Sequence, residues 1–361
     1  MTEAEIKTII TKQRDFFAKG ETLPVAKRIA ALKKLYGAVK SHEKEITEAL
    51  TADLGKSVLE GFMCEAGLVM SEISYMIKHT RKFAKDSSRV TCRTNFAAKS
   101  FVKSSPYGIV LIMSPWNYPF LLTIDPLVDA LAAKRITWGK YLNCGQTCVA
   151  PDYVLCHEAV KDKFISELKK QIKLQFGENP LENKNYGKII NAKHFERVCG
   201  LIDAAKVAAG GKSNAETLKI EPTVLDNVSW DDAVMGEEIF GPVLPVLTYK
   251  TEEELYQIIN AHQKPLALYL FTQNKGLQKR VMTRCSFGGG CINDVVVHLA
   301  TNNMGFGGVG ESGMGAYHGK VGFDTFSHKK SIVDKKTWID VNMRYQPYTK
   351  SKETFLRLFL K

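Results

Sequence analysis

The sequence predicts an α/β fold, and two observations carry that prediction. Between Val25 and Ala84 the apolar residues recur at helical spacing, with lysines and glutamates opposite them. From Pro151 to Thr272, strand-like and helix-like segments alternate. The 361 residues are 45% hydrophobic and 24% charged, an ordinary globular mixture that excludes disordered and fibrous classes. A chain of this length can bury a sizeable core and form two or more domains.

Composition and cysteine spacing argue against a membrane, exported or zinc protein. No charge-free apolar run is long enough to cross a bilayer, and residues 1–6 lack the basic-then-apolar order of a signal peptide. Eight cysteines without a C-x-x-C pair indicate free thiols, so we expect a cytoplasmic location. Cys144 and Cys148 have no histidine pair nearby, and we expect no metal site.

The net charge of +12 raises the question of nucleic-acid binding. The densest basic cluster is interrupted by apolar residues in a strand-like alternation and consists of Lys329, Lys330, Lys335 and Lys336. Such lysines typically lie on the solvated edge of a sheet and discourage aggregation. We therefore expect no nucleic-acid partner. A mildly basic surface also suits an anionic cofactor.

The first part of the chain predicts helices followed by strands. One helical face spans Val25 to Leu50, and a second helix spans about Val58 to Ala84. Strand-like residues between Ser87 and Ser105 predict a hairpin or a pair of edge strands. A further strand from Gly108 to Met113 leads into the segment Ser114 to Pro119.

Asn117 lies in that last segment, between Pro115 and Pro119 and beside two aromatic residues. The prolines fix the backbone on both sides, so the side-chain amide is aimed in advance, as an oxyanion donor requires. The alternative is an Asx turn that closes the end of the strand. Local sequence alone leaves both interpretations open.

Cys148 lies in the stretch Tyr141 to Pro151, which follows an apolar segment and breaks at Gly145. A turn between two packed elements can expose a thiol while holding it in one direction, and the thiolate is a strong nucleophile. The alternative is a buried structural cysteine, because cysteine is among the most buried residue types. A catalytic role therefore depends on partners elsewhere in the chain.

The second half of the chain carries the alternation of strands and helices. The expected elements are a strand at Tyr153–Cys156, a helix at Val160–Phe176, a helix around Phe195–Gly210, a strand at Pro222–Leu225, a strand at Val243–Tyr249, a helix at Glu252–Ala261, a strand at Leu266–Thr272, a strand at Lys330–Met343 and an amphipathic helix at Lys350–Lys361.

A glycine-rich segment in this half imitates a dinucleotide-binding fingerprint. Gly308, Gly310 and Gly313 have G-x-G-x-x-G spacing, with Asp334 about twenty residues further on. No apolar strand leads into these glycines, and further glycines follow where a helix should begin. We therefore expect a tight packing loop and not a phosphate-binding loop.

Four segments together resemble, in order, the signature segments of the NAD(P)-dependent aldehyde dehydrogenases. They are Ser114 to Pro119, Gly145-Gln146-Thr147-Cys148, Glu237 to Pro242, and Phe306 to Gly313. The segments Tyr317 to Gly319, Phe326 to Lys329 and Gln346 to Lys350 are similar to the class 3-type, fatty-aldehyde branch. At Gly305 the family usually has a proline, a departure that removes no functional group.

The resemblance implies roles for four residues. Cys148 would attack the aldehyde carbonyl, forming a thiohemiacetal and then a thioester. Asn117 and the backbone N–H of Cys148 would form the oxyanion hole, while Glu238, with Phe240 beside it, would hold the ribose of NAD or NADP. The residue types suit this chemistry, because a thiolate adds readily to a carbonyl and leaves readily from a thioester. Medium- or long-chain aliphatic or aromatic aldehydes are the implied substrates.

The resemblance also implies an aldehyde dehydrogenase-like fold and a homodimer. Residues 134–329 would form the catalytic α/β domain. The remaining expected parts are an incomplete Rossmann-type cofactor domain at residues 1–86 and 106–133, oligomerisation strands at residues 87–105 and 330–345, and a C-terminal helix at residues 346–361.

The chain departs from the family after Ala132. The helix from Leu121 to Ala132 should be followed by a lysine segment that binds the cofactor, a turn at the pyrophosphate, and an E-L-G-G-K segment that activates the deacylating water. Here Lys134 and Arg135 run directly into the helix before Cys148, so roughly a hundred residues, about one small domain, are missing.

Two explanations for this departure are open. Either the polypeptide lacks the segment, or two stretches of a longer chain are joined across it. The apolar faces that the missing strands should cover favour the second. A true deletion makes two alternatives relevant, a cofactor-independent thiol esterase or acyl-transfer enzyme using Cys148 and Asn117, and a catalytically impaired dimeric scaffold.

Overall fold

The computed structural model describes residues 2–91, 98–106, 132–299, 301–338, 340 and 345–359. The chain divides into two compact units. The first unit is Met1–Ala30, Ile77–Val110 and Phe323–Lys361, and the second is Ala31–Met76 and Leu111–Gly322. Asn117 and the expected strand at Gly108–Met113 lie outside the described residues.

The sheet of the first unit is three-stranded and antiparallel, in the order β1, β2, β11. Its strands are β1 (Ser87–Arg89), β2 (Ala98–Pro106) and β11 (Ser327–Lys335). The pairing of β1 with β2 confirms the strands predicted between Ser87 and Ser105. β11 begins earlier and ends earlier than predicted, because its register with β2 runs from Ser327 opposite Pro106 to Lys335 opposite Ala98.

The N-terminal helices are more broken than the sequence pattern predicted. They are α1 (Glu3–Ala18), α2 (Val25–Ser41), α3 (Glu43–Leu54), α4 (Val58–Gly61) and α5 (Gly67–Phe83), with a π-helix, η1 (Phe62–Ala66), between the last two. The single helix predicted from Val25 to Leu50 is wrong, because the chain breaks at His42 into α2 and α3. Gly55 ends α3 in a left-handed conformation (φ 68°), which glycine adopts without strain.

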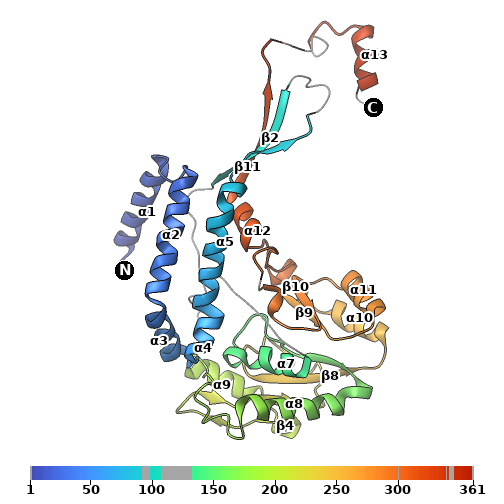
Figure 1. The fold of residues 1–361 in the computed structure, drawn as a ribbon. Helices are drawn as coiled ribbons and strands as arrows, with labels where there is room; N and C mark the ends of the chain where they lie inside the picture. The colour runs from blue at the N-terminus through green and yellow to red at the C-terminus, as the bar shows by residue number, and fades with distance from the viewer. Residues whose placement is uncertain are drawn as a thin grey trace. The chain divides into compact units, whose positions relative to one another are not determined.

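A four-stranded sheet forms the centre of the second unit, in the order β3, β8, β7, β4. β3 (Val154–His157), β8 (Val243–Tyr249) and β7 (Thr223–Leu225) are parallel, and β4 (Val207–Ala209) is antiparallel to β7. Val243 to Leu247 are all buried, as expected for a central strand covered on both faces. Figure 1 shows α7 (Ala132–Tyr141) and α8 (Lys161–Phe176) side by side near this sheet.

One helix of this unit is shorter than predicted. The helix expected from Phe195 to Gly210 is α9 (Ala192–Gly200), and residues 207–209 form β4 instead. Asn191 caps the start of α9 through a side-chain bond from the backbone N–H of His194. Pairing of Val207 with Leu225 of β7 draws the following segment into the sheet, which outweighs its helical pattern.

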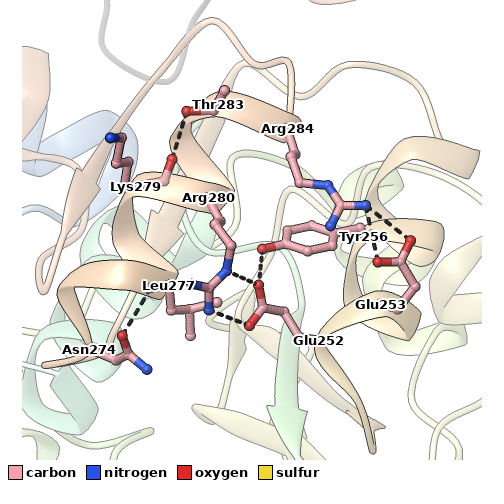
Figure 2. A network of polar contacts seen from close by, with 9 residues as sticks. All are labelled: Glu252, Glu253, Tyr256, Asn274, Leu277, Lys279, Arg280, Thr283 and Arg284. Carbon is pink, nitrogen blue, oxygen red and sulfur yellow. Dashed lines mark hydrogen bonds and ion pairs between the residues drawn. The ribbon is translucent and has the colours of Figure 1, made fainter.

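A smaller parallel pair, β9 (Ala267–Leu270) and β10 (Gly289–Ile292), is flanked by α10 (Glu252–Ala261) and α11 (Lys275–Arg284). Figure 2 shows the charged network that joins the two helices. Glu252 pairs with Arg280, and this bond lowers the pKa of the Glu252 carboxyl to about 2. Arg284 pairs with Glu253 and lies 4.0 Å from the centre of the Tyr256 ring.

The remaining described elements are short. They are η3 (Leu142–Gly145), η4 (Glu158–Val160), η5 (Ala204–Lys206), β5 (Ser213–Asn214), β6 (Lys219–Ile220), η6 (Ala233–Met235), η7 (Val297–Leu299), η8 (Gly310–Ser312), α12 (Gly319–Thr325) and α13 (Lys350–Phe359). The glycine-rich segment around η8 is a tight packing loop, as predicted. A Cβ on Gly308 would lie 2.0 Å from the carbonyl oxygen of Ser312.

Candidate active site

The loop that carries Cys148 begins with three left-handed residues. α7 ends at Tyr141, and Asn143 (φ 49°), Cys144 (φ 53°) and Gly145 (φ 75°) follow. Two consecutive non-glycine residues in this region are strained, at about 1 kcal/mol or more each. Such strain persists only where surrounding contacts fix the backbone, so this turn is held by its neighbours.

Gly145 brings the loop against the Glu237–Pro242 segment. A Cβ on Gly145 would lie 2.1 Å from the carbonyl oxygen of Gly241, so only glycine permits this approach. Gly241 is similarly confined, because its Cβ would lie 2.7 Å from a methyl group of Val198. Two of the sequence segments predicted to act together therefore meet backbone to backbone.

Gln146 fixes the loop to residues 188–190. Its Nε2 donates to the carbonyl oxygens of Asn143 and Lys188, both at 3.0 Å. Its Oε1 accepts from the backbone N–H of Ile190 at 3.0 Å. The side chain is fully buried, so each of these bonds would be costly to leave unmade.

The Cys148 thiol lies at the partly buried end of this loop. Burial first, and then the nearby Glu238 carboxylate, raise the pKa of this thiol to about 11, although hydrogen bonds from the backbone N–H groups of Cys148 and Val149 oppose the shift. At neutral pH this favours the protonated thiol, which must lose its proton before the sulfur can act as the predicted nucleophile. Tyr269 donates from its hydroxyl to the carbonyl oxygen of Val149 at 2.8 Å, which fixes the peptide after the cysteine.

Glu238 is held in place through the backbone beside it. Asp152 accepts from the backbone N–H of Ile239 at 3.3 Å, and Arg197 donates to the carbonyl oxygen of Ile239 at 2.6 Å. Burial and the neighbouring Asp152 raise the pKa of the Glu238 carboxyl. Phe240 adopts φ 47°, a strained left-handed conformation directly after the fixed peptide.

A buried lysine lies close to the Asp152 carboxylate. Lys140, on α7, has a fully buried side chain, and its Nζ is 3.8 Å from Asp152 Oδ1. Burial lowers the pKa of its ammonium group to about 8, although Asp152 and Glu238 both oppose that shift. Lys140, Asp152, Glu238 and Arg197 thus form one charge cluster beside Cys148.

The structure brings together three of the four residues singled out from sequence. Cys148, Glu238 and Phe240 belong to the two segments that meet at Gly145 and Gly241, whereas Asn117 lies outside the described residues. Sequence reasoning missed Lys140, Asp152 and Arg197. A charge inside the apolar segment before Cys148 was the available signal for Lys140.

Two features are absent from the residue ranges given above. No group of three or more His, Cys, Asp or Glu residues there could hold a metal ion. No helix in that part of the chain is long and apolar enough to cross a membrane.

Comparison with known proteins identifies the family. The model of the "Aldehyde dehydrogenase family" matches residues 1–134 and 129–332. A 4,4'-diaponeurosporen-aldehyde dehydrogenase of Staphylococcus aureus is 35% identical over 446 aligned residues, which cover 96% of this chain and 97% of that protein. A dimeric NADP-preferring aldehyde dehydrogenase of Canis lupus familiaris is 34% identical and covers 95% of this chain and 98% of its own length.

A solved structure agrees with these matches. The substrate-bound state of Staphylococcus aureus AldH superposes with a TM-score of 0.94 at 33% identity, over 100% of both chains. The aldehyde dehydrogenase-like α/β fold predicted from the sequence is thereby confirmed.

The alignments also locate the interruption. The S. aureus relative aligns over 446 residues, more than the 361 of this chain, so the alignment must contain a large gap. The two family matches meet at residues 129–134. This is the point at which the sequence departs from the family, and roughly a hundred residues, a small domain, are missing there.

Proposed function

The chain belongs to the aldehyde dehydrogenase family of NAD(P)-dependent oxidoreductases, and from this we propose that Cys148 is the nucleophile with which it oxidises aldehydes to carboxylic acids. The observation that supports this role is the contact between Gly145 and Gly241, which fixes the cysteine loop against the Glu238 segment. No other cysteine among the described residues follows a strained turn held in this way.

The reaction begins with loss of the thiol proton and attack of sulfur on the carbonyl carbon. A carbon–sulfur bond forms, and the carbonyl oxygen becomes an alkoxide. The backbone N–H of Cys148 and the Asn117 amide donate to that oxygen and stabilise its charge. Loss of hydride from the carbon gives a thioester, and water then releases the carboxylic acid and restores the thiol.

NAD+ or NADP+, the cofactors of the homologues, supply the hydride acceptor when bound. The residues present fit one end of the dinucleotide. Glu238 is exposed, and the backbone of the next residue, Ile239, is fixed by Asp152 and Arg197, so the Glu238 carboxylate would hold the hydroxyls of the nicotinamide ribose. The segments that hold the pyrophosphate in the family are those missing from this chain, so the other end is not matched.

The substrate class we propose is medium- or long-chain aliphatic or aromatic aldehydes. The name of the S. aureus relative, a 4,4'-diaponeurosporen-aldehyde dehydrogenase, supports a large apolar substrate. The canine relative is named as dimeric, which supports a homodimer for this chain. The sheet of β1, β2 and β11 is the part of the first unit that we assign to that contact.

The test is nicotinamide reduction by the chain with its mass verified near 40.3 kDa. A panel of aliphatic aldehydes of increasing length and of aromatic aldehydes is offered with NAD+ and with NADP+. Absorbance change that disappears in Cys148→Ala supports the proposal. If a folded preparation gives no change in nicotinamide absorbance with any of these aldehydes, the proposal is wrong.

A second candidate function is favoured by the break in the family match, whose two parts meet at residues 129–134. Without the missing segment, Cys148 could still form and release a thioester from an ester, acting as a cofactor-independent esterase or acyl-transfer enzyme. Ester hydrolysis that vanishes in Cys148→Ala and is indifferent to NAD(P)+ would favour this candidate. Equal turnover in that variant would rule it out.

A further inference from the structure

We propose that Glu60 is a positioning residue for the nucleophile, holding the strained turn that precedes Cys148. This inference rests on the proposed role of Cys148. Glu60 lies on α4, which none of the matched signature segments includes. Its Oε1 accepts a hydrogen bond from the backbone N–H of Asn143 at 3.1 Å.

The bond is made at the first residue of the left-handed turn. Asn143 and Cys144 are non-glycine residues with φ of 49° and 53°, so the turn needs outside contacts to persist. The side chain of Asn143 bonds within the loop, donating from Nδ2 to the carbonyl oxygen of Gln146 at 3.1 Å. Glu60 adds a contact from a different part of the chain, 83 residues away in sequence.

Glu60 is itself firmly placed. Ser57 caps α4 by accepting from the backbone N–H of Glu60 at 3.2 Å, which fixes the start of the helix. Lys56, just before Ser57, is buried and forms an ion pair of 2.6 Å with the buried Glu65, which ties η1 to the start of α4. The carboxyl is thus presented to the loop from a rigid base.

The Glu60–Asn143 bond completes a chain of hydrogen bonds that links helices α3 and α4 to the cysteine loop. Leu54, at the end of α3, accepts from the backbone N–H of Lys188 at 3.1 Å. The carbonyl oxygen of Lys188 accepts from Gln146, and Gln146 also bonds Asn143. The bond between Glu60 and the backbone N–H of Asn143 then connects the loop to α4. The two ends of the turn before Cys148 are therefore fixed to the consecutive helices α3 and α4.

The charge of Glu60 is not what the turn requires. Burial raises the pKa of its carboxyl and so disfavours the charged form, and an amide oxygen can accept the same hydrogen bond from the backbone N–H of Asn143. Glu60→Gln keeps an acceptor and removes the charge, whereas Glu60→Met keeps the shape and removes the acceptor. These two variants separate the hydrogen bond from the other properties of the side chain.

The experiment measures acylation of Cys148 as the burst of 4-nitrophenol released from 4-nitrophenyl acetate at pH 9. We expect Glu60→Gln to keep the burst rate within about twofold, and Glu60→Met to slow it by about tenfold, the effect of losing one hydrogen bond to a buried group. Mass-resolved alkylation of Cys64 and Cys156, two buried cysteines outside the turn, should be the same in both variants, because the turn moves without general loosening.

Three outcomes would overturn the inference. They are an unchanged burst in Glu60→Met, an equal loss in Glu60→Gln, or greater alkylation of Cys64 and Cys156 in Glu60→Met than in Glu60→Gln. A burst that survives Cys148→Ala has a different meaning. The proposed nucleophile is then wrong, and the role of Glu60 falls with it.

Discussion

Gly145 and Gly241 approach so closely that a Cβ on Gly145 would lie 2.1 Å from the carbonyl oxygen of Gly241. One residue is three positions before Cys148, and the other is three positions after Glu238. This backbone contact joins the proposed nucleophile to the proposed cofactor-binding carboxylate. It leaves no space for a side chain, so the active-site geometry depends on two glycines.

Gly145→Ala is therefore expected to disrupt the site. The alanine would be strained at φ 75°, and its methyl group would force the two segments apart. We expect a loss of about 3 kcal/mol or more in unfolding free energy, and no burst of ester acylation. Gly55→Ala is the matched control, since Gly55 has φ 68° and its nearest atoms would lie 3.4 Å away. That variant should lose about 1 kcal/mol and keep the burst. Similar losses in both variants would contradict the role of the contact.

Much of the fold could be predicted from local pattern. The strand at Val243–Tyr249 and the helix at Glu252–Ala261 match β8 and α10, because both have strong periodicity and clear ends. The helix predicted to Gly210 failed because pairing with β7 decides the structure of residues 207–209. Such pairing joins distant segments, and a local pattern does not contain it.

Part of the candidate site could likewise be predicted from local sequence, and part of it depends on contacts between distant residues. Cys148 and Glu238 could be singled out because their segments resemble a family in order and in residue type. The raised pKa of the Cys148 thiol could not, because it depends on burial and on a carboxylate ninety positions away. The hydrogen bonds of Asp152 and Arg197 to the backbone of Ile239 could not be predicted either, because a bond to a backbone peptide leaves no local pattern in the sequence.

Gln146→Met is expected to loosen the cysteine loop. Methionine keeps the shape of the side chain but leaves the N–H of Ile190 and two carbonyl oxygens without their buried partner. We expect a loss of roughly 2 kcal/mol or more in urea unfolding and a slower acylation burst. Gln175→Met, which removes one bond to the carbonyl oxygen of Lys134 near the surface, should cost less than about 1 kcal/mol. Equal stability of the two variants would show that Gln146 does not brace the loop.

The acylation burst should increase with pH up to about 11, because burial raises the pKa of the Cys148 thiol to that value. Glu238→Gln removes the nearby negative charge, which favours the thiolate, so the profile should move to lower pH and the burst at pH 8 should become faster. Glu237→Gln is the control, because Glu237 is exposed and pairs with Arg197. A profile that is unchanged in Glu238→Gln, or moved equally in Glu237→Gln, would contradict this assignment.

Lys140 should make the unfolding free energy depend on pH in an unusual direction. Burial lowers the pKa of its ammonium from 10.5 to about 8, so the folded state disfavours the charged form. Below pH 8 the lysine is charged in both the folded and the unfolded state, so the full free-energy cost of burying its charge is present. Between pH 8 and 10.5 folding releases a proton, and the unfolding free energy rises by up to roughly 1.4 kcal/mol per pH unit. Urea unfolding at pH 7.5, 8.5 and 9.5 should show this rise as a growing difference between the unmodified protein and Lys140→Met. Buried cysteines such as Cys144 have raised pKa values that lower stability above pH 9, but they are common to both proteins and cancel in this difference. Lys161→Met should keep it, because its bond with Asp226 raises the pKa of Lys161 and no titration of that lysine falls in this range. The same pH dependence in the unmodified protein and in Lys140→Met would show that the buried ammonium does not titrate as described.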